Sequence, residues 1–403
     1  MTIPLLAGLK RKSVLAVVAL AILTLFPVAT LFFEKDSVIL SAGILKMGGA
    51  KQVLYFHEDS SATVTVEQVS DAGGGSYRSL SVNGVNVAGT SPDLVAIQKM
   101  QGHLPLLLHS DPHSVLHIGF GSGGTAWSVS THSVDRIVIA EISQAVIKAS
   151  ERYFPDNNHG ISMRPDVREN IRICDGRNFL LGTREKFDVI LSDSIHPRYA
   201  GNGSLYTLDY YRLCRERLKP GGVLSQWLPI YSLTPETFKM ILRSFQDVFP
   251  HTTVWYVNSV INPYTIVIGT MDPFGIDHDR LEKKLQKKGI RDDLKDIGLS
   301  DVYQLYDYFL FEGRQAETFA DSVPFHTDDY PAVEYLAGKV LDREQTWLQN
   351  FDELLHFRER ILPYVRPGKS FDEERMKGLY ETTGLELEKQ LESLRKSQPK
   401  PQG

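Results

Sequence analysis

A glycine-rich turn between two apolar runs constrains the fold of this chain more than any other feature. Residues 115–118 lead into the turn at 119–125, and a second apolar run at 136–140 ends in Glu141, about 20 residues after the turn. This spacing is typical of a nucleotide-binding α/β sheet, where glycines let the backbone approach the ligand and the carboxylate binds ribose hydroxyls. The predicted nucleoside-binding residues in this stretch are Gly119, Gly121, Ser122, Gly123 and Glu141.

Three later runs extend the same pattern. They span residues 171–176, 187–193 and 223–227. Their near-continuous apolar character, alternating with helical segments, predicts a parallel sheet covered on both faces. Since ligands bind beyond the carboxyl ends of such strands, Glu141, Asp175 and Asp193 are expected to converge on one pocket. Each acid alone is equally well explained as a helix cap or a solvated turn residue, but three at consecutive strand ends favour a site.

Composition limits the classes of function. The chain has 403 residues, with 42% hydrophobic and 23% charged residues, which predicts a folded protein of two or three domains. The formal net charge is -5 without a concentrated basic face, so no nucleic-acid partner is expected. The only cysteines, Cys174 and Cys214, form no disulfide framework, and no cysteine/histidine cluster has zinc-ligand spacing, so no metal is expected.

The N-terminal region predicts a membrane anchor. Residues 13–33 carry no charge and would form a helix of roughly 31 Å, enough to cross a hydrocarbon core of about 30 Å. A cleavable signal peptide is the rival interpretation, but the run is long for one. Basic residues lie on both sides of it, so charge alone leaves the orientation open. Because a nucleotide-like cofactor is available in the cytoplasm, a single-pass membrane protein with a cytoplasmic catalytic domain is predicted.

The chain divides into five predicted segments. These are an N-terminal segment (1–40) with a transmembrane helix at about 13–33, a small antiparallel β domain with a leading helix (41–105), a Rossmann-like catalytic domain (106–275), a helical extension with a loop (276–340) and a charged helical C-terminal region with a disordered tail (341–403). The β domain is indicated by alternating apolar runs between turn signals, of which Asn83-Gly84 is a strong one.

Taken together, these elements resemble the spermidine synthase (polyamine aminopropyltransferase) family over roughly residues 53–270. The motifs that carry the resemblance are residues 80–85, Gln98 with 103–106, the glycine turn, Glu141, Asp175-Gly176, Asp193-Ser194 and residues 218–224. Residues 292–298 and 326–334 are similar to the membrane-associated branch of that family. The resemblance implies a Rossmann-like S-adenosylmethionine-dependent transferase sheet preceded by the small β domain, and a homo-oligomer.

The resemblance also implies roles for individual residues. The donor would be decarboxylated S-adenosylmethionine, whose sulfonium activates a methylene carbon for attack by a small amine such as putrescine, with no metal. Asp193 would be the catalytic residue that accepts or steers the amine's proton. The implied contacts are Glu141 with the ribose, Asp175-Gly176 with the adenine, Gln98 near the sulfonium, and His196 and Gln226 with the amine.

Two departures from the family pattern keep other hypotheses open. Ser122 stands where the family has an aspartate that pairs with the donor's ammonium, and His196 stands where it has a second acid for the amine. The first alternative is therefore a methyltransferase that uses intact S-adenosylmethionine. The second is a membrane-anchored module that binds a nucleoside or polyamine without turnover.

Overall fold

The computed structural model describes residues 51–70, 74–193, 195–199, 201–337 and 342–397. The predicted transmembrane helix at about 13–33 and the predicted disordered tail at the C-terminus lie outside the described residues. Within the described part of the chain, no helix combines the length and the apolar character that a membrane crossing requires.

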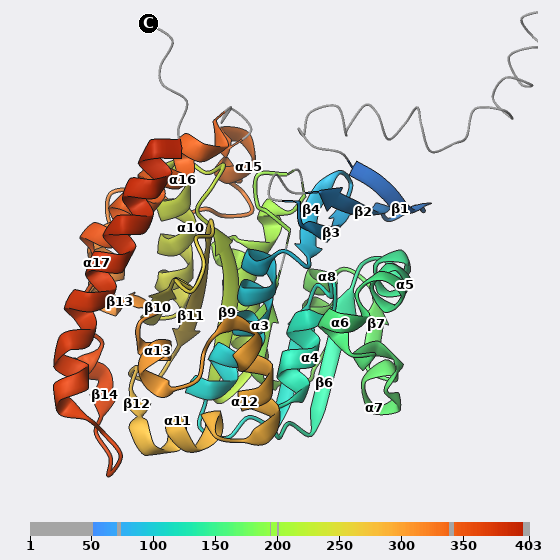
Figure 1. The fold of residues 1–403 in the computed structure, drawn as a ribbon. Helices are drawn as coiled ribbons and strands as arrows, with labels where there is room; N and C mark the ends of the chain where they lie inside the picture. Colours follow the sequence, from blue (N-terminus) through green and yellow to red (C-terminus); the bar gives the residue numbers. More distant parts are fainter. Residues whose placement is uncertain (1–50, 71–73, 194, 200, 338–341, 398–403) are drawn as a thin grey trace, which may run out of the picture.

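A four-stranded antiparallel sheet precedes the main body of the protein (Figure 1). Its strands are β1 (Lys51–Glu58), β2 (Thr63–Ser70), β3 (Ser76–Val82) and β4 (Val85–Gly89). Asn83 and Gly84 join β3 to β4, and both have positive φ (52° and 77°), which is the backbone that a two-residue hairpin turn requires. The predicted small antiparallel β unit is therefore confirmed.

The core of the protein is an eight-stranded sheet in the order β13-β10-β11-β9-β8-β5-β6-β7. Its strands are β5 (Ser114–Ile118), β6 (Arg136–Glu141), β7 (Ile171–Ile173), β8 (Phe187–Ser192), β9 (Leu218–Pro229), β10 (His251–Trp255), β11 (Tyr264–Thr270) and β13 (Phe309–Glu312). The five strands predicted from the glycine turn and the later apolar runs, β5 to β9, are all parallel. The α/β fold with a Rossmann-like sheet is thus confirmed.

The sheet is mixed rather than parallel throughout. β11 pairs with β9, and β10 with both β11 and β13, in antiparallel register. β10 and β11 are joined by a short connection, which permits an antiparallel pair but not a parallel crossover. β13 comes from the segment expected to be helical with a loop (276–340), so this extension completes the sheet instead of lying apart from it.

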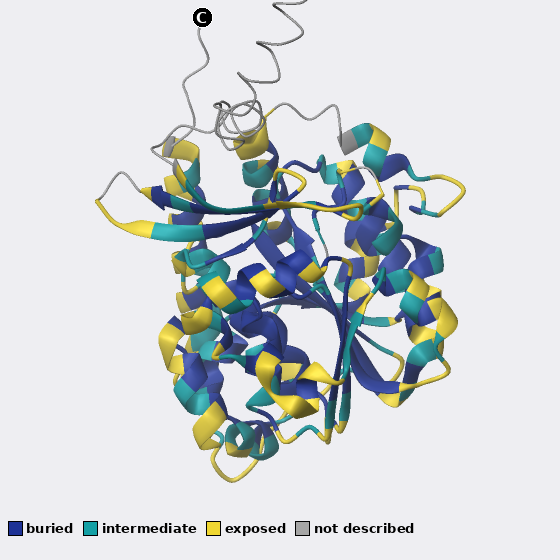
Figure 2. Ribbon diagram, turned by 90° about the vertical axis from the view of Figure 1, so that its right-hand side faces the viewer, coloured by how far each residue is buried: buried dark blue, intermediate teal, exposed yellow. Residues whose placement is uncertain are grey.

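Helices cover both faces of the sheet, and the sheet strands are buried between them (Figures 1 and 2). One face packs against α3 (Pro92–Leu108), α4 (Gly124–Ser130), α5 (Gln144–Tyr153), α11 (His278–Leu285), α12 (Lys288–Leu294) and α13 (Val302–Tyr306). The other face packs against α8 (Gly176–Gly182), α9 (Leu208–Arg217), α10 (Pro235–Val248), α14 (Gly313–Ala320), α16 (Arg343–His356) and α17 (Glu373–Ser397). The remaining elements are α6 (Pro155–Asn158), α7 (Pro165–Arg168), α15 (Ala332–Ala337) and the parallel pair β12 (Ile276–Asp277) and β14 (Val365–Arg366).

Helix α3 lies between the small sheet and the central sheet and carries polar residues into the interior. Pro92 at its first turn fixes a helical φ, and Asp93 complements the positive end of the helix dipole. From residue 96 to 107 every side chain is buried, including those of Gln98, Gln101 and His103. Buried polar groups need hydrogen-bond partners or bind a ligand, so we expect α3 to contribute residues to a functional site.

A buried ion pair fixes the extension to the Rossmann-like body. Asp293 of α12 accepts hydrogen bonds from Lys99 Nζ (2.5 Å) and His103 Nε2 (2.8 Å) of α3. It also accepts hydrogen bonds from Trp127 Nε1 (3.0 Å) and Ser128 Oγ (2.6 Å) of α4. Burial opposes the ionisation of Asp293, but the contacts with His103 and Lys99 outweigh it and hold its pKa well below the usual range. One carboxylate therefore ties three helices together.

Candidate functional site

Two adjoining cavities open beyond the carboxyl ends of the parallel strands. The larger has a volume of about 880 Å³ and the smaller about 440 Å³. They have a common wall, formed by Val87, Gln98, Asp193 and Ile195, which line both. The position of both cavities at the strand ends is the one that the fold class favours for ligands.

The glycine turn forms one side of the larger cavity and brings two strand ends close together. Gly119 has φ +86°, and a Cβ there would lie 2.4 Å from the carbonyl oxygen of Asp193. Gly119 and Gly121, at φ +54°, both line the cavity. The backbone is therefore open to a ligand at these two positions, as predicted from the sequence.

Gly123 lies outside the lining of the larger cavity. It is the N-cap of α4 at φ +82° and packs behind the turn. A Cβ at this position would lie 2.7 Å from both Asn158 and the ring of Phe120. The third glycine is thus required for packing of the turn, and its contact with a ligand stays a prediction.

Glu141 points into the larger cavity from the end of β6. Its Oε2 accepts a hydrogen bond from the backbone N–H of Phe120 (2.8 Å), and its Oε1 accepts one from Ser143 (3.0 Å). Burial raises the pKa of Glu141, and these two amides oppose the rise. Each oxygen retains a lone pair for a further donor, so the carboxylate can accept hydrogen bonds from two vicinal hydroxyls.

Asp175 and Gly176 line the larger cavity beside Glu141. Asp175 is the N-cap of α8, where its Oδ1 accepts a hydrogen bond from Asn178 N (2.8 Å), and Gly176 packs against Ile118. Asp175 is therefore a helix cap that also lines the cavity, because the helix begins at the cavity wall, and its contact with a ligand stays a prediction.

Ser122 and Gln98 are linked at the junction of the two cavities. Ser122 Oγ donates a hydrogen bond to Gln98 Oε1, and the Gln98 amide donates to Leu94 O (2.8 Å) and Gly89 O (3.2 Å). These contacts fix the orientation of Gln98. Ser122 is almost wholly buried and contributes no charge to the cavity that it lines.

Asp193 follows β8 and faces both cavities. Its backbone N–H donates to Ile118 O (3.0 Å), which holds it at the end of β5, and its Oδ2 accepts a hydrogen bond from Thr125 Oγ1 (3.0 Å). His117 Nε2 lies 3.6 Å from the same oxygen. Sequence reasoning missed His117, because it occupies one position of an otherwise apolar strand. The convergence of Glu141, Asp175 and Asp193 on one cavity is confirmed.

The smaller cavity is lined by aromatic and polar side chains. Its aromatic lining comes from Trp227, Tyr231 and Tyr264, and its polar lining includes His196 and Gln101. His196 Nε2 donates to Tyr231 O (2.8 Å), and its Nδ1 accepts from Arg198 N (3.1 Å), which assigns the tautomer. Burial lowers the pKa of His196 to about 3, so the ring is neutral at physiological pH.

The positions of two glutamines, Gln226 and Gln101, differ from the sequence prediction. Gln226 lines neither cavity, because strand alternation turns Trp227 toward the smaller cavity and Gln226 to the opposite face. Its buried amide donates to Ser192 O (3.3 Å) and Trp227 O (3.0 Å) instead of facing an amine. Gln101 was missed, although its position three residues after Gln98 on the same helix face could have indicated it.

Metal-binding side chains do not gather in the part of the chain that the structure describes. No group of three or more histidine, cysteine, aspartate or glutamate side chains there could hold an ion. The chemistry that the described site offers is therefore that of carboxylates, amides and aromatic surfaces.

Comparisons with known proteins find relatives of this chain. A family model described as the spermine/spermidine synthase domain matches residues 94–270, from the first turn of α3 to the end of β11. A polyamine aminopropyltransferase of Nitrosomonas europaea is 32% identical over 197 residues, which cover 47% of this chain and 59% of that protein. Polyamine aminopropyltransferase 1 of Pseudomonas aeruginosa is 31% identical over 235 residues, which cover 58% of this chain and 79% of that protein.

The matched regions differ in extent between relatives. The chain spans 59% of the length of the Nitrosomonas europaea protein and 58% of a Thermotoga petrophila polyamine aminopropyltransferase. Among solved structures, a spermidine synthase from Thermotoga maritima has 21% sequence identity and a TM-score of 0.47, with 72% of this chain and 84% of that chain covered.

Proposed function

The chain belongs to the spermine/spermidine synthase family, and on this premise we propose that it transfers an aminopropyl group from decarboxylated S-adenosylmethionine to a primary amine. The observation that carries the proposal is the position of Asp193, whose side chain lies in the common wall of the two cavities. A donor in the larger cavity and an amine in the smaller one would meet at this carboxylate. Two substrates that react directly need such an arrangement.

The larger cavity suits the adenosyl part of the donor. Glu141 has free lone pairs for the ribose hydroxyls, and the backbone at Gly119 and Gly121 is open to the ligand. Asp175, at the cavity wall, would accept a hydrogen bond from the adenine amino group. Gln98 would border the sulfonium, since it lines both cavities with its amide held by backbone carbonyls.

The reaction needs little beyond positioning and removal of one proton. An ammonium has no lone pair, so the amine must be deprotonated before it attacks the methylene carbon beside the sulfonium. The new C–N bond forms as the C–S bond breaks, the electron pair of that bond passes to sulfur, and 5′-methylthioadenosine leaves. Asp193, whose side chain is 25% exposed, would accept the amine's proton and release it to solvent.

One observation favours a different donor. Ser122 is buried and uncharged at the place where a carboxylate would stabilise the ammonium of a decarboxylated donor. A methyltransferase that binds intact S-adenosylmethionine is the second candidate for this reason. The two candidates differ in product, since the methyltransferase would release S-adenosylhomocysteine, and a module that only binds would release neither product.

The full-length protein incubated with each donor and a set of primary amines tests the proposal. We expect 5′-methylthioadenosine only when the decarboxylated donor and an amine are both present. Asp193→Asn should lower turnover by at least about 100-fold while the affinity for the donor persists. Asp292→Asn, which changes a partly exposed acid on α12, is the matched control and should keep full turnover. Unchanged turnover in Asp193→Asn would remove this residue from the mechanism.

The membrane location belongs to the same proposal. The absence of charge from residues 13–33 and the supply of the donor in the cytoplasm support a single-pass anchor with a cytoplasmic catalytic domain, as in the membrane-associated branch of the family. The full chain should then sediment with membranes and resist carbonate extraction, whereas a variant without residues 13–33 should not. A homo-oligomer formed through the small sheet stays a prediction, which light scattering of the solubilised protein checks.

A further inference from the structure

The smaller cavity contains only one acidic side chain among the residues that the structure describes as lining it. That acid is Asp193, and the other polar groups are neutral: Asn86, Gln98, Gln101, His196 and the tyrosine hydroxyls of Tyr231 and Tyr264. A diamine carries two ammonium groups at neutral pH, and each buried ammonium needs a carboxylate or several acceptors. Asp193 can serve the reacting amine but not a second cation at the other end of the cavity.

His196 does not act as an acceptor for a second cation. Both of its ring nitrogens are engaged with backbone groups, Nε2 with Tyr231 O and Nδ1 with Arg198 N. The ring lies edge-on to Tyr231, with a centroid distance of 4.8 Å. It therefore offers the cavity an aromatic surface rather than a polar atom.

Positive charge lies close to the wall of the cavity that Tyr231 forms. The Arg343 guanidinium sits over the Tyr231 ring, 4.1 Å from its centroid. Burial raises the pKa of Tyr231 to about 12, and the charges of Arg343 and Arg198 oppose this rise more strongly than Asp93 adds to it. A cation at this wall would meet two arginines, and this is unfavourable.

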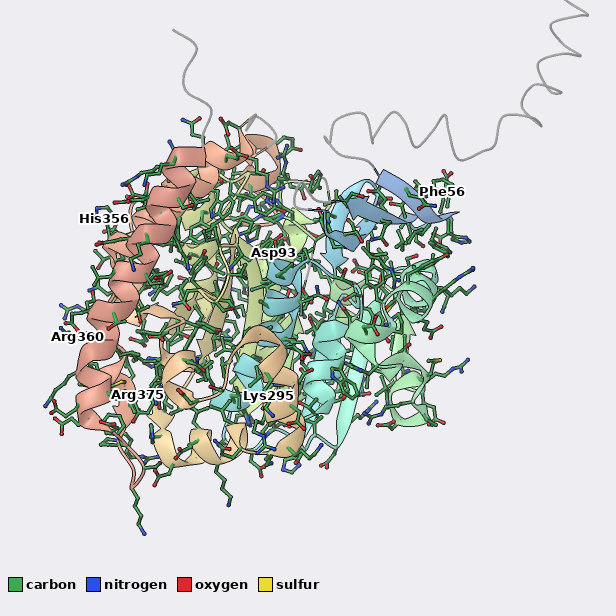
Figure 3. All side chains as sticks on the ribbon, in the orientation of Figure 1. Phe56, Asp93, Lys295, His356, Arg360 and Arg375 are labelled. Atoms are coloured by element: carbon green, nitrogen blue, oxygen red, sulfur yellow. The ribbon has the colours of Figure 1, made fainter. Side chains whose placement is uncertain are left out.

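Asp93 is the carboxylate outside the lining that bears on this cavity. It lies in the first turn of α3, partly exposed, and is labelled in Figure 3. Burial raises the pKa of Tyr264, and the negative charge of Asp93 raises it further. The positive charge of Arg343 lowers this pKa by less than Asp93 raises it. Asp93 is thus a carboxylate outside the lining that could favour a cation near the cavity, in addition to Asp193 within the lining.

Gln101 provides a partner of a different kind. It is 1% exposed, lines the smaller cavity, and neither atom of its carboxamide has a hydrogen-bond partner among the described residues. An orphan amide of this kind is costly unless a ligand uses it. A carboxamide can donate to and accept from a neutral hydroxyl or amide, but it cannot neutralise an ammonium.

We propose that the acceptor is a primary monoamine whose other end is uncharged and forms hydrogen bonds, such as an amino alcohol, in preference to a diamine with two ammonium groups. The reacting amine binds at Asp193, the carbon chain lies against Trp227 and Tyr264, and the neutral end bonds to the Gln101 carboxamide. This inference rests on the proposed aminopropyl transfer and deepens it by naming the class of acceptor.

The test compares acceptors of equal length with the full-length protein and decarboxylated S-adenosylmethionine. We expect kcat/KM for 4-amino-1-butanol to exceed that for putrescine by at least tenfold, with n-butylamine between them. A preference for putrescine would overturn the inference and leave the proposed function intact. If no amine yields 5′-methylthioadenosine, the proposed function itself fails, so the two failures are distinguishable.

Three variants test which residues determine the preference for one acceptor over another. Gln101→Leu should reduce the advantage of 4-amino-1-butanol over n-butylamine to within about twofold, and Gln101→Glu should raise kcat/KM for putrescine at least tenfold. If Gln101→Glu does not fold, as judged by its thermal melting curve, Gln101→Leu decides alone. Asp93→Asn should leave the ratio between acceptors unchanged. An unchanged acceptor ratio in Gln101→Leu, or loss of putrescine turnover in Asp93→Asn, would overturn the inference.

Discussion

His117 Nε2 lies 3.6 Å from Asp193 Oδ2, and the histidine ring is completely buried on β5 with no hydrogen-bond partner for either nitrogen in the described structure. A buried polar group without a partner lowers stability. An imidazole N–H directed at Asp193 would orient the carboxylate that the proposed mechanism uses.

His117→Leu is expected to raise the free energy of unfolding by about 1 kcal/mol while lowering kcat about tenfold, because it removes both the orphan nitrogens and the support of Asp193. Urea denaturation and the rate of 5′-methylthioadenosine formation measure the two effects. His117→Gln retains an N–H group and should recover most of the turnover. A leucine variant with full turnover would show that His117 does not assist Asp193.

Ser122→Asp tests how the donor's arm is recognised. The new carboxylate would face Gln98 Oε1, which now accepts the serine hydroxyl, so it also carries a local cost. We expect the affinity for decarboxylated over intact S-adenosylmethionine to rise about tenfold, because an added negative charge favours the ammonium of the decarboxylated arm. Calorimetric titration of both donors measures this ratio. Ser122→Ala, which removes the hydroxyl without adding charge, is the control, and an equal ratio in both variants would contradict the prediction.

Asp293→Ala should destabilise the protein by about 3 kcal/mol, because Lys99, whose side chain is 8% exposed, would keep only the exposed Asp296 of its two acidic partners, and His103 would lose its acceptor. The adjacent Asp292 is the matched control: it pairs only with exposed lysines and an arginine, and its replacement by alanine should change stability by less than about 0.5 kcal/mol. Urea denaturation of both variants measures the difference. Similar losses in the two would mean that the buried ion pair does not hold the extension.

Stability should fall as the pH drops from 7 to 5. Burial lowers the pKa of His103, and it lowers the pKa of His132 well below its usual range, so both rings stay neutral in the folded state. When His103 is neutral and donates its Nε2 N–H to Asp293, its Nδ1 accepts a hydrogen bond from His132 Nε2 (2.9 Å). The unfolded chain binds protons below pH 6.5 that the folded chain does not, so its free energy is lowered there.

Each such histidine contributes a slope of up to about 1.4 kcal/mol per pH unit, and denaturant titrations at several pH values measure it. His132→Asn should reduce the slope of the unfolding free energy against pH by the contribution of one proton, up to about 1.4 kcal/mol per pH unit. His113 provides a control of opposite sign, because its contacts with Asp135 and Asp111 raise its pKa. Its contribution to stability is present at low pH and lost as the pH rises, so His113→Asn should steepen the fall. A slope unaffected by His132→Asn would contradict the assignment.

The acids of the site could be predicted from the sequence because their placement follows from topology. The carboxyl ends of adjacent parallel strands meet at one edge, so Glu141, Asp175 and Asp193 had to lie near one another once the strands were recognised. Gly119 and Gly121 followed from the same turn. The packing of Gly123 did not, since the turn's own geometry directs the third glycine toward Phe120.

Other parts depend on contacts that local patterns do not encode. His117 gains its importance from what packs around it, and a single polar residue in an apolar strand gives little signal of that kind. Gln101 had a local signal in its spacing from Gln98, but the lack of a hydrogen-bond partner for its carboxamide among the described residues becomes evident only in three dimensions. The antiparallel half of the sheet has the same origin. A short strand such as β13 resembles many other apolar tetrapeptides, and its pairing with β10 becomes evident only in three dimensions.

The late position of β13 in the chain has a consequence for biosynthesis. The ribosome releases β10 more than fifty residues before β13, its second partner, at Phe309–Glu312. Throughout that interval β10 is an open edge, and exposed edges of nascent sheets are where intermolecular pairing begins. A nascent chain that stalls before residue 309 would therefore be a substrate for chaperones. The four residues of β13 cover the edge of β10, and the helices that follow β13 pack onto a sheet that is already complete.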